Sequence, residues 1–322
     1  MLAVAVQPAA AQAPAPERSI TQVTGDLYRF QNNQHFGLYL LTRAGVIVAD
    51  PINRDTANWL KGEIAARHNN AKVAAVVYSH HHWDHASGAD AFEGARVLGR
   101  PEMVSALQGP AATTGLGAQA AADANRDGLL QRTEATGAMA QNFAAFDADG
   151  NGGLSAREIF LGQHRDVTAP ADIWRNPIRE FTLGGKIVEL HHVGGTDAAD
   201  LTYIHFPVER ALLVVDVISP GRLPNIAADY NEAHQFELLD KAASFQATHI
   251  IGGHGLSGTK ADLDAQKAYF TELRAAVQAS INAGQTVEQA KASVKMEKYA
   301  NWIAYRDRIG PNVEGMYAVL KR

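Results

Sequence analysis

Apolar runs broken by glycine and asparagine follow one another through the N-terminal part of the chain. After about residue 20 they are "QVTGDLYRFQ", "FGLYLLTR" and "GVIVAD". Short runs of Val, Ile, Leu and Tyr with such breaks are typical of consecutive strands joined in hairpins. The next stretch, "TANWLKGEIAARHN", has apolar and small residues at helical spacing and ends in Asn, which predicts a helix. "KVAAVVY" is then continuously apolar, as expected for a strand buried on both faces.

A second set of strand-like runs begins at about residue 180 and consists of "KIVELHHV", "LTYIHF", "ALLVVDVI" and "THIIGG". A helical stretch, "NEAHQFELLDKAASF", precedes the last run. "TKADLDAQKAYFTELRAAVQASINAG" predicts a long helix that Thr259 caps, and Thr286 with Gln289 forms a capping box for another helix. Two strand-rich halves, each flanked by helices, indicate a layered α/β fold.

The segment in the middle of the chain has a different composition. It is rich in Ala, Gly, Asp and Asn and lacks strand-like runs, so we interpret it as an insertion. The expected organisation is then a leader and linker, an α/β domain in two pieces, the insertion between them and a C-terminal helical segment. In chain order these are residues 1–18, 19–109 with 166–260, 110–165, and 261–322.

The N-terminus resembles the end of a secretory signal. Ala11-Gln12-Ala13 is a small-x-small pattern like a signal-peptidase site, and a Pro-rich linker follows it. A disordered, Ala-rich N-terminus is the alternative. We favour the signal remnant, which predicts a periplasmic or secreted protein.

Composition excludes several classes of function. The net charge of -5 gives no sign of a basic surface that would bind nucleic acid, so nucleic acid is not an expected partner. The expected partner is a small-molecule substrate. No later stretch is long and apolar enough to span a membrane. Cysteine is absent, so histidines and carboxylates are the only strong metal ligands that the chain offers. The oligomeric state is not predicted.

The insertion contains two twelve-residue segments, "DANRDGLLQRTE" and "DADGNGGLSARE", that fit the EF-hand calcium loop. Oxygens at alternate positions converge on a hard cation, glycine permits the sharp turn, and the final Glu supplies two oxygens. Asx-rich turns are the simpler interpretation of one such loop, but two complete loops favour two bound Ca²⁺ ions. Leu130 and Leu154 are expected to pair in a short ribbon between the loops. The predicted ligands are Asp123, Asn125, Asp127, Leu129 (carbonyl) and Glu134 in the first loop, and Asp147, Asp149, Asn151, Gly153 (carbonyl) and Glu158 in the second.

Directly after "VAAVVY", the chain reads "SHHHWDH", with four histidines and one aspartate in seven residues. A structural histidine normally occurs alone, so this crowding indicates a metal. His80 and His82 are two apart on a loop that leaves a strand, so both can face one metal. Asp84 and His85 would turn toward a second position. His81 is expected to point away.

His80-x-His82-x-Asp84-His85 resembles the ligand motif of the metallo-β-lactamase superfamily, and the similarity extends from about residue 20 to 260. Asp50 closes the strand "GVIVAD" like the aspartate of an early strand in that family. Asp216 stands where the family has its metal-bridging carboxylate, and His254 in "GGHG" matches its last histidine ligand. The resemblance implies a four-layer αββα sandwich, here carrying the EF-hand pair and the C-terminal helices.

The resemblance also implies a function. One or two Zn²⁺ ions would provide a metal-bound hydroxide that attacks an ester, lactone, thioester or amide bond, with Asp84 orienting the hydroxide as the catalytic residue. Iron or manganese would also suit a site made of His and carboxylates.

One family ligand is missing from the chain. The family usually has a further histidine in a Gly-His-Thr or Ala-His-Thr loop, whereas this chain has Gly195, Thr196 and Asp197 there. Asp197 replaces the imidazole, or His191 or His192 reaches in, or the first site is weak. We favour Asp197 as the substitute.

Two other functions stay open. The altered ligand set is compatible with a mononuclear iron oxidoreductase similar to the sulfur dioxygenases of this superfamily. The chain could instead be a calcium-binding module with a degenerate active site. Substrate specificity is expected to come from the loop at residues 219–231 and from the insertion.

Overall fold

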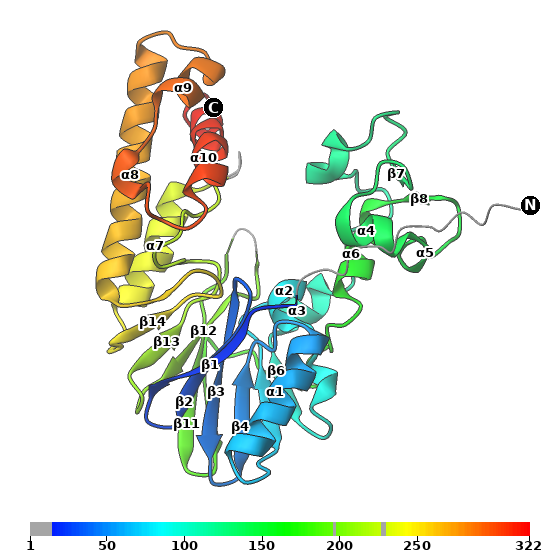
Figure 1. The fold of residues 1–322 in the computed structure, drawn as a ribbon, viewed down its shortest axis with the longest axis vertical. Coiled ribbons are helices and arrows are strands. Elements are labelled where there is room, and N and C mark those ends of the chain that lie inside the picture. Colours follow the sequence, from blue (N-terminus) through cyan, green and yellow to red (C-terminus); the bar gives the residue numbers. More distant parts are fainter. Residues whose placement is uncertain (1–14, 196–197, 227–229) are drawn as a thin grey trace, which may run out of the picture.

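Two β-sheets lie face to face in the middle of the molecule (Figure 1). The protein is represented by a computed structural model that describes residues 15–195, 198–226 and 230–322. Most of the expected leader and Asp197 therefore lie outside the described residues. In order across the first sheet the strands are β1 (Arg18–Thr24), β2 (Leu27–Asn32), β3 (His35–Thr42), β4 (Gly45–Ala49), β5 (Val73–Val77), β6 (Arg96–Gly99) and β9 (Asp172–Ile173). Those of the second are β10 (Ile178–Leu183), β11 (Lys186–His192), β12 (Thr202–Phe206), β13 (Ala211–Leu213), β14 (His249–Ile251) and β15 (Ser257–Gly258).

Apolar side chains from both sheets form the central layer of the core. Leu40 and Val77 of the first sheet share one buried cluster with Phe206 and Leu213 of the second. Along each strand, successive side chains point to opposite faces of the sheet, so every second residue points into this layer. The apolar runs predicted as strands therefore supply the inside of a sandwich.

Helices cover the two outer faces. On the first sheet, α1 (Arg54–Arg67) packs Leu60 and Ile64 against the outward-facing Val46 and Val48 of β4. On the second, α7 (Glu232–Ala243) and α8 (Lys260–Asn282) share a buried cluster with the outward-facing side chains of β12 and β13, and α10 (Tyr305–Leu320) packs on α8. The α/β fold with four layers, helix–sheet–sheet–helix, is thus present as expected.

The C-terminal segment forms helices whose starts the sequence predicts. The side chain of Thr259 accepts a hydrogen bond from a backbone N–H at the start of α8, and the Asp262 carboxylate accepts one from the Thr259 backbone N–H. Thr286 and Gln289 form the same reciprocal capping box at α9 (Val287–Ser293). Both caps satisfy N–H groups that have no partner within a helix.

The insertion has a small core of its own. Leu130, Phe143, Phe146 and Ile159 share a buried cluster, and β7 (Leu130–Gln131) pairs with β8 (Gly153–Leu154) so that Leu130 faces Leu154, as predicted. The insertion and the C-terminal helices rise on opposite sides of the same end of the sandwich, the end where α2 lies (Figure 1).

The other helices of the chain are short. They are α2 (Trp83–Ala86), α3 (Pro101–Ala106), α4 (Gly137–Gln141), α5 (Phe143–Phe146) and α6 (Ala156–His164), with 3-10 turns at Ala89–Ala91, Gly117–Ala121 and Glu297–Tyr299.

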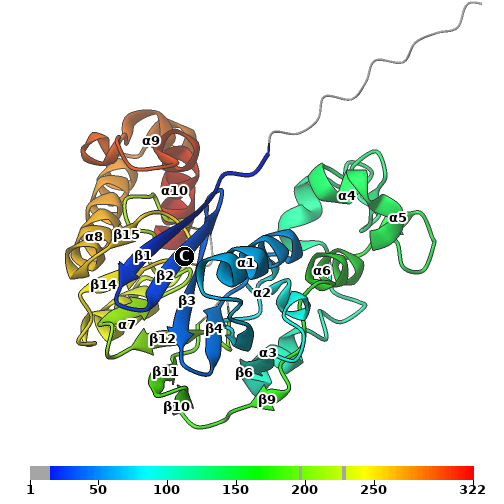
Figure 2. The same cartoon turned by 60° about the horizontal axis from the view of Figure 1, so that its bottom comes forward.

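The turned view in Figure 2 shows α6 packed beside α2 and the C-terminal helices over the second sheet. Among the helices that the structure describes, none has the length and hydropathy needed to cross a membrane.

Candidate metal centre

Four strands deliver the polar residues of the site to one end of the sandwich. β4 and β5 are parallel neighbours in the first sheet, and β13 and β14 are parallel neighbours in the second. Asp50 and His80 lie just beyond the first pair, whereas Asp216 and His254 lie just beyond the second pair. The carboxyl ends of parallel strands are where α/β proteins bind their ligands, so this end is the expected place for a site.

Buried hydrogen bonds hold the loop after β5 in place. The Asp50 carboxylate accepts a 2.8 Å bond from the Ser79 backbone N–H. The Ser79 hydroxyl pairs at 2.9 Å with Nδ1 of His80, which leaves Nε2 of His80 facing Asp216. α2 follows at once and carries Asp84 and His85. Asp50 thus acts on the site through Ser79 and not as a ligand.

The carboxylate of Asp216 is the point on which the histidines converge. Four imidazoles turn a ring nitrogen to it. Three come from "SHHHWDH", with His85 already in α2, and one comes from the loop after β14. The distances to its oxygens are 3.1 Å from His80 Nε2, 3.5 Å from His82 Nδ1, 3.4 Å from His85 Nε2 and 3.3 Å from His254 Nε2. The residues predicted from the motif and its distant partners are therefore brought together.

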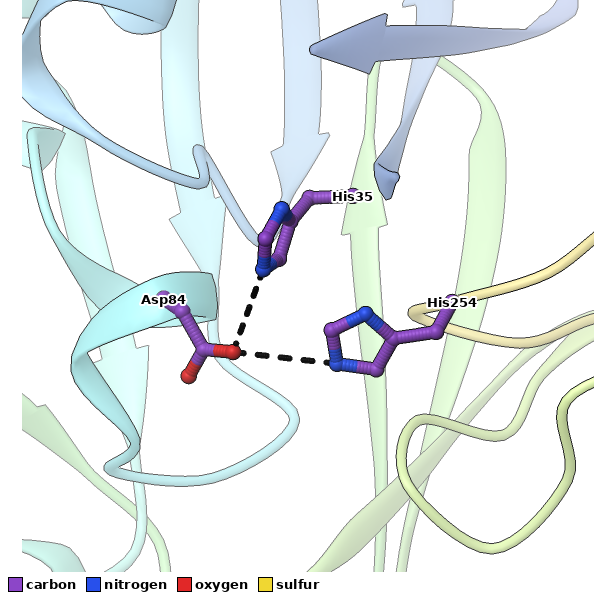
Figure 3. A group of neighbouring side chains, drawn as sticks. All are labelled: His35, Asp84 and His254. Carbon is purple, nitrogen blue, oxygen red and sulfur yellow. Dashed lines mark ion pairs between the residues drawn. The ribbon is translucent and has the colours of Figure 1, made fainter. Parts of the chain in front are cut away.

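Asp84 forms a second group with two histidines from distant parts of the chain (Figure 3). Its Oδ2 lies 3.3 Å from Nε2 of His35 and 3.7 Å from Nε2 of His254. His85 Nε2 is 3.6 Å from the same oxygen. Asp84 and the three imidazoles around it therefore lie on one side of the site. His80 and His82 approach Asp216 from the other side.

His35 is a site residue that the sequence pattern does not predict. It begins β3, and an isolated bridge joins it to His254 across more than half of the chain. A single histidine at a strand start carries no motif, so the only sequence signal would have been a polar residue opening an otherwise apolar run.

Charges in the group depend strongly on one another. Burial would raise the pKa of Asp216, but the positive charge of His85 and hydrogen bonds from the other histidines hold it well below its ordinary value. Burial would lower the pKa of His85, but Asp216 and Asp84 outweigh burial and raise it to about 9. The carboxylates are therefore ionised and draw positive charge to the space between them.

The residues present fit a divalent metal. Nε2 of His85 and Nε2 of His254 approach to 3.2 Å. Two such nitrogens are held close most favourably by a shared cation. Nε2 of His80 is buried and lies 3.1 Å from the Asp216 carboxylate, but not in the geometry of a regular hydrogen bond. Imidazole and carboxylate donors in this number are those of zinc sites.

A family model of the metallo-β-lactamase superfamily matches residues 53–254, well over half of the chain.

The chain belongs to the metallo-β-lactamase superfamily.

It is accordingly placed among the metallo-hydrolases, as predicted.

Solved structures share the fold of this superfamily member at low sequence identity. The sec-alkylsulfatase Pisa1 from Pseudomonas sp. superposes with a TM-score of 0.63 at 18% identity, over 93% of this chain and 50% of that one. The metallo-β-lactamase from Pontibacter korlensis gives 0.54 at 14% identity, over 78% of this chain and 98% of that one. Metallo-β-lactamase IND-7 gives 0.52 at 17% identity, over 77% and 95%. The chain thus spans half the length of the alkylsulfatase, and no curated protein sequence matched it.

The ligand missing from the family pattern is not replaced by the neighbouring strand histidines. His191 instead faces Glu189 and His205, and Nε2 of His192 lies 2.9 Å from the Ala199 carbonyl oxygen. Thr196 and Asp197 are outside the described residues.

His81 points away from the metal centre, as predicted. Its Nδ1 lies 2.8 Å from Oδ1 of the buried Asp200, and its ring stacks on His164 at 5.9 Å between centroids. His164 stacks in turn on Phe160 of the same helix, α6. The middle histidine of the motif therefore connects the metal loop to the insertion.

A cavity of about 380 Å³ opens beside the metal centre. His82 and Asp216 line one side, and Tyr230 of the loop at residues 219–231 lines another. Arg308 of α10 also lines it, and Arg222 lies near enough to Asp216 for their charges to interact. Nε and Nη1 of Arg222 are buried and lack hydrogen-bond partners in the part of the chain that the structure describes.

The two predicted calcium loops have the same backbone form. Arg126 and Gly128 in the first loop, and Gly150 and Gly152 in the second, occupy matching positions with positive φ. Oδ1 of Asp123 and of Asp147, the first residue of each loop, is buried and lacks a hydrogen-bond partner within the described residues. One carboxylate oxygen each of Asp147, Asp149 and Glu158 lie within 4.8 Å of one another.

Gly253 is required for the position of His85. A Cβ at residue 253 would stand 2.5 Å from Cε1 of His85 and 2.6 Å from Cγ1 of Val215, closer than real contacts allow. We expect Gly253→Ala to displace His85 and lower the metal content per chain, measured by elemental analysis after dialysis. Gly62→Ala is the control, because a Cβ there would meet no atom within 4 Å apart from its chain neighbours and the backbone of its own helix. Equal metal content in both variants would show that His85 does not depend on this close approach.

Proposed function

We propose that the protein is a metal-dependent hydrolase of a small molecule with an ester, lactone, thioester or amide bond. The observation that carries this is the Asp216 carboxylate, which four imidazole nitrogens surround at 3.1–3.5 Å beside a cavity large enough for a substrate. Polar groups that converge in a concave site are the arrangement of enzyme active sites.

The residues divide between two metal positions. His80 and His82 belong to the first position, and Asp84, His85 and His254 belong to the second, where His35 adds a further imidazole. Asp216 stands between the two. For the incomplete first position we propose Asp197, because Gly195 and Ala198 on either side of it in sequence both line the cavity.

When bound, a divalent ion such as zinc lowers the pKa of water to ~7 and polarises the substrate oxygen. The chain's own part is to orient the reacting groups. Asp84, ionised because His35 and His85 outweigh the effect of burial, accepts a hydrogen bond from the attacking water at its free oxygen and so aims it at the substrate. The wall formed by α7, α8 and α10 limits access of bulk water, which strengthens these electrostatic interactions.

A sulfate ester is the second candidate substrate. Arg308 lines the cavity and Arg222 lies close to it, and burial lowers the pKa of both guanidinium groups. Half-buried guanidinium groups of this kind match the geometry of a sulfate, phosphate or carboxylate group. The structural similarity to a sec-alkylsulfatase points to the same group.

Loss of the converging residues should abolish hydrolysis. We expect His82→Ala and Asp84→Asn to reduce kcat/KM by at least about 100-fold, the cost of one electrostatic group in an active site. The assay is a panel of carboxylic esters, lactones, thioesters, amides, sulfate esters and phosphodiesters. Matched controls are His249→Ala and Asp240→Asn, which lie away from the centre.

Identical background rates in wild type and in both active-site variants would remove the enzymatic proposal and favour a binding module. Bound iron with consumption of oxygen would instead favour the oxidoreductase.

We propose further that the insertion binds two Ca²⁺ ions and thereby supports the metal centre. The repeated backbone form of the loops and the buried Oδ1 atom of each first aspartate, which lacks a hydrogen-bond partner within the described residues, support this proposal. The final glutamate of the second loop, Glu158, is also the third residue of α6 and completes a capping box with Ser155. An ion held by Glu158 would therefore fix the start of α6.

The far end of α6 contacts the metal loop. His164 and Phe160 pack on His81, as described above, and the Gly88 N–H donates a 2.8 Å bond to the Asp166 carbonyl oxygen, just beyond α6. Gly88 follows α2, which carries Asp84 and His85. A location outside the cytoplasm, expected from the N-terminal sequence, would supply the calcium.

Removal of calcium should destabilise the protein without removing the catalytic metal. About 100-fold saturation contributes ~2.7 kcal/mol per site if only the folded state binds, so Ca²⁺ should raise Tm, and selective chelation should lower Tm and activity. Glu158→Gln should lose much of this response, whereas Glu237→Gln on the exposed side of α7 should keep it. A Tm and an activity that calcium leaves unchanged in the wild type would exclude the proposal.

A further inference from the structure

The histidine that fails to join the metal centre belongs to a second cluster. His191 lies on β11 two residues after Glu189, so both side chains point to the same face of the second sheet. In the antiparallel register of β11 and β12, His205 stands directly opposite Glu189. Directly opposed residues have Cβ atoms about 4.5–5.5 Å apart, so the backbone alone brings these three side chains together.

The side chains make use of that closeness. Nδ1 of His205 is 2.8 Å and Nε2 of His191 is 3.1 Å from the same oxygen of Glu189. Burial would raise the pKa of Glu189, but the two histidines outweigh it, so the carboxylate stays ionised. Two imidazoles and one carboxylate therefore converge on one point.

The cluster is largely enclosed. The side chains of His205 and His191 are only 9% and 11% exposed, and the ring of Phe245, just after α7, packs edge-on against both imidazoles. Such packing fixes the ring orientations. On the open side, Glu180 of β10 stands directly opposite Glu189 in the register of the two strands. Like charges at directly opposed positions destabilise a sheet unless a cation lies between them.

We propose that Glu189, His191 and His205 form a second transition-metal site, of the zinc type, on the outer face of the second sheet. Imidazole and carboxylate donors together suit Zn²⁺, and also Ni²⁺ or Cu²⁺, in preference to the oxygen-seeking Ca²⁺ and Mg²⁺. A tetrahedral zinc ion with bonds of about 2.0–2.2 Å separates its ligand atoms by roughly 3.3–3.6 Å. The observed 2.8 and 3.1 Å are a few tenths shorter, so small side-chain rotations admit the ion. Water or Glu180 completes the coordination.

The role of this site is structural. The ion ties β11 to β12, the two strands that flank Gly195, Ala198 and Leu201, which line the cavity beside the metal centre. It lies outside the group of residues that converge on Asp216, so it contributes to stability and not to the chemical step. This inference is independent of the proposed hydrolytic activity.

Counting bound zinc tests the site. The full chain, stripped of metal and held in saturating calcium so that the carboxylate loops are occupied, is titrated with Zn²⁺ against a chromophoric chelator. We expect Glu189→Gln and His205→Gln to bind one equivalent of Zn²⁺ less than wild type, or to bind that equivalent at least about 10- to 100-fold more weakly. Loss of a residue that only hydrogen-bonds to a metal ligand already weakens metal binding by that much. His249→Gln, on β14 of the same sheet, is the matched control and should bind as wild type does.

A second measurement separates this site from the principal centre and from misfolding. In the Asp216→Asn background, Zn²⁺ should still raise Tm. Adding Glu189→Gln, which preserves side-chain volume, should make that rise smaller, while the far-UV circular dichroism of the metal-free protein stays unchanged. Equal zinc stoichiometry and affinity in wild type, Glu189→Gln and His249→Gln would overturn the proposal.

Discussion

The carboxylate of Asp216 is the constraint on which the rest of the site depends. Although its side chain is 28% exposed, other protein groups crowd around it, and a carboxylate so placed is costly unless positive charge lies beside it. Here four imidazole nitrogens approach it within 3.1–3.5 Å, and they come from the loop after β5, from α2 and from the loop after β14. The negative charge of the carboxylate in turn favours positive charge on the imidazoles, so neither group is stable in this position without the other. Divalent ions satisfy both.

The sandwich is what makes this arrangement possible. Apolar strands from the two sheets share one interior, and the parallel pairs β4–β5 and β13–β14 both direct their carboxyl ends to the end of the sandwich that holds the site. Close approach of chain segments then places the ligands. Gly253 lies against the ring of His85, and the Phe36 N–H donates to the Gly253 carbonyl oxygen, which brings His35 next to His254. The fold thus positions each ligand through backbone contacts that no single motif encodes.

Much of this architecture was predictable from local sequence. The runs that became β2 to β5 and β11 to β14 have continuous or alternating apolar residues, and the capping boxes at Thr259 and Thr286 depend only on neighbouring residues. β10 was not predicted, because three of its six residues are exposed and its apolar pattern is weak. The pairing of Leu130 with Leu154 was predictable, since the spacing of the two loops dictates it.

The residues of the candidate site likewise include some that the sequence predicts and some that it does not. "SHHHWDH" reveals four of its members because they are close in sequence, and Asp216 and His254 followed from strand ends and the family resemblance. His35 and Arg308 could not be predicted, because their roles depend on contacts between segments that are far apart in the chain. His191, which was kept as an alternative ligand because of its place in the sequence, belongs to another cluster, and only the pairing of the strands reveals this.

The central claim is that Asp216 stands between two metal positions. Anomalous diffraction from zinc-loaded crystals, recorded on both sides of the zinc absorption edge, tests it most directly. The account predicts two peaks that flank the Asp216 carboxylate, one beside His80 and His82 and the other beside Asp84, His85 and His254. A map with no peak at Asp216, or with zinc bound only elsewhere in the molecule, would contradict it.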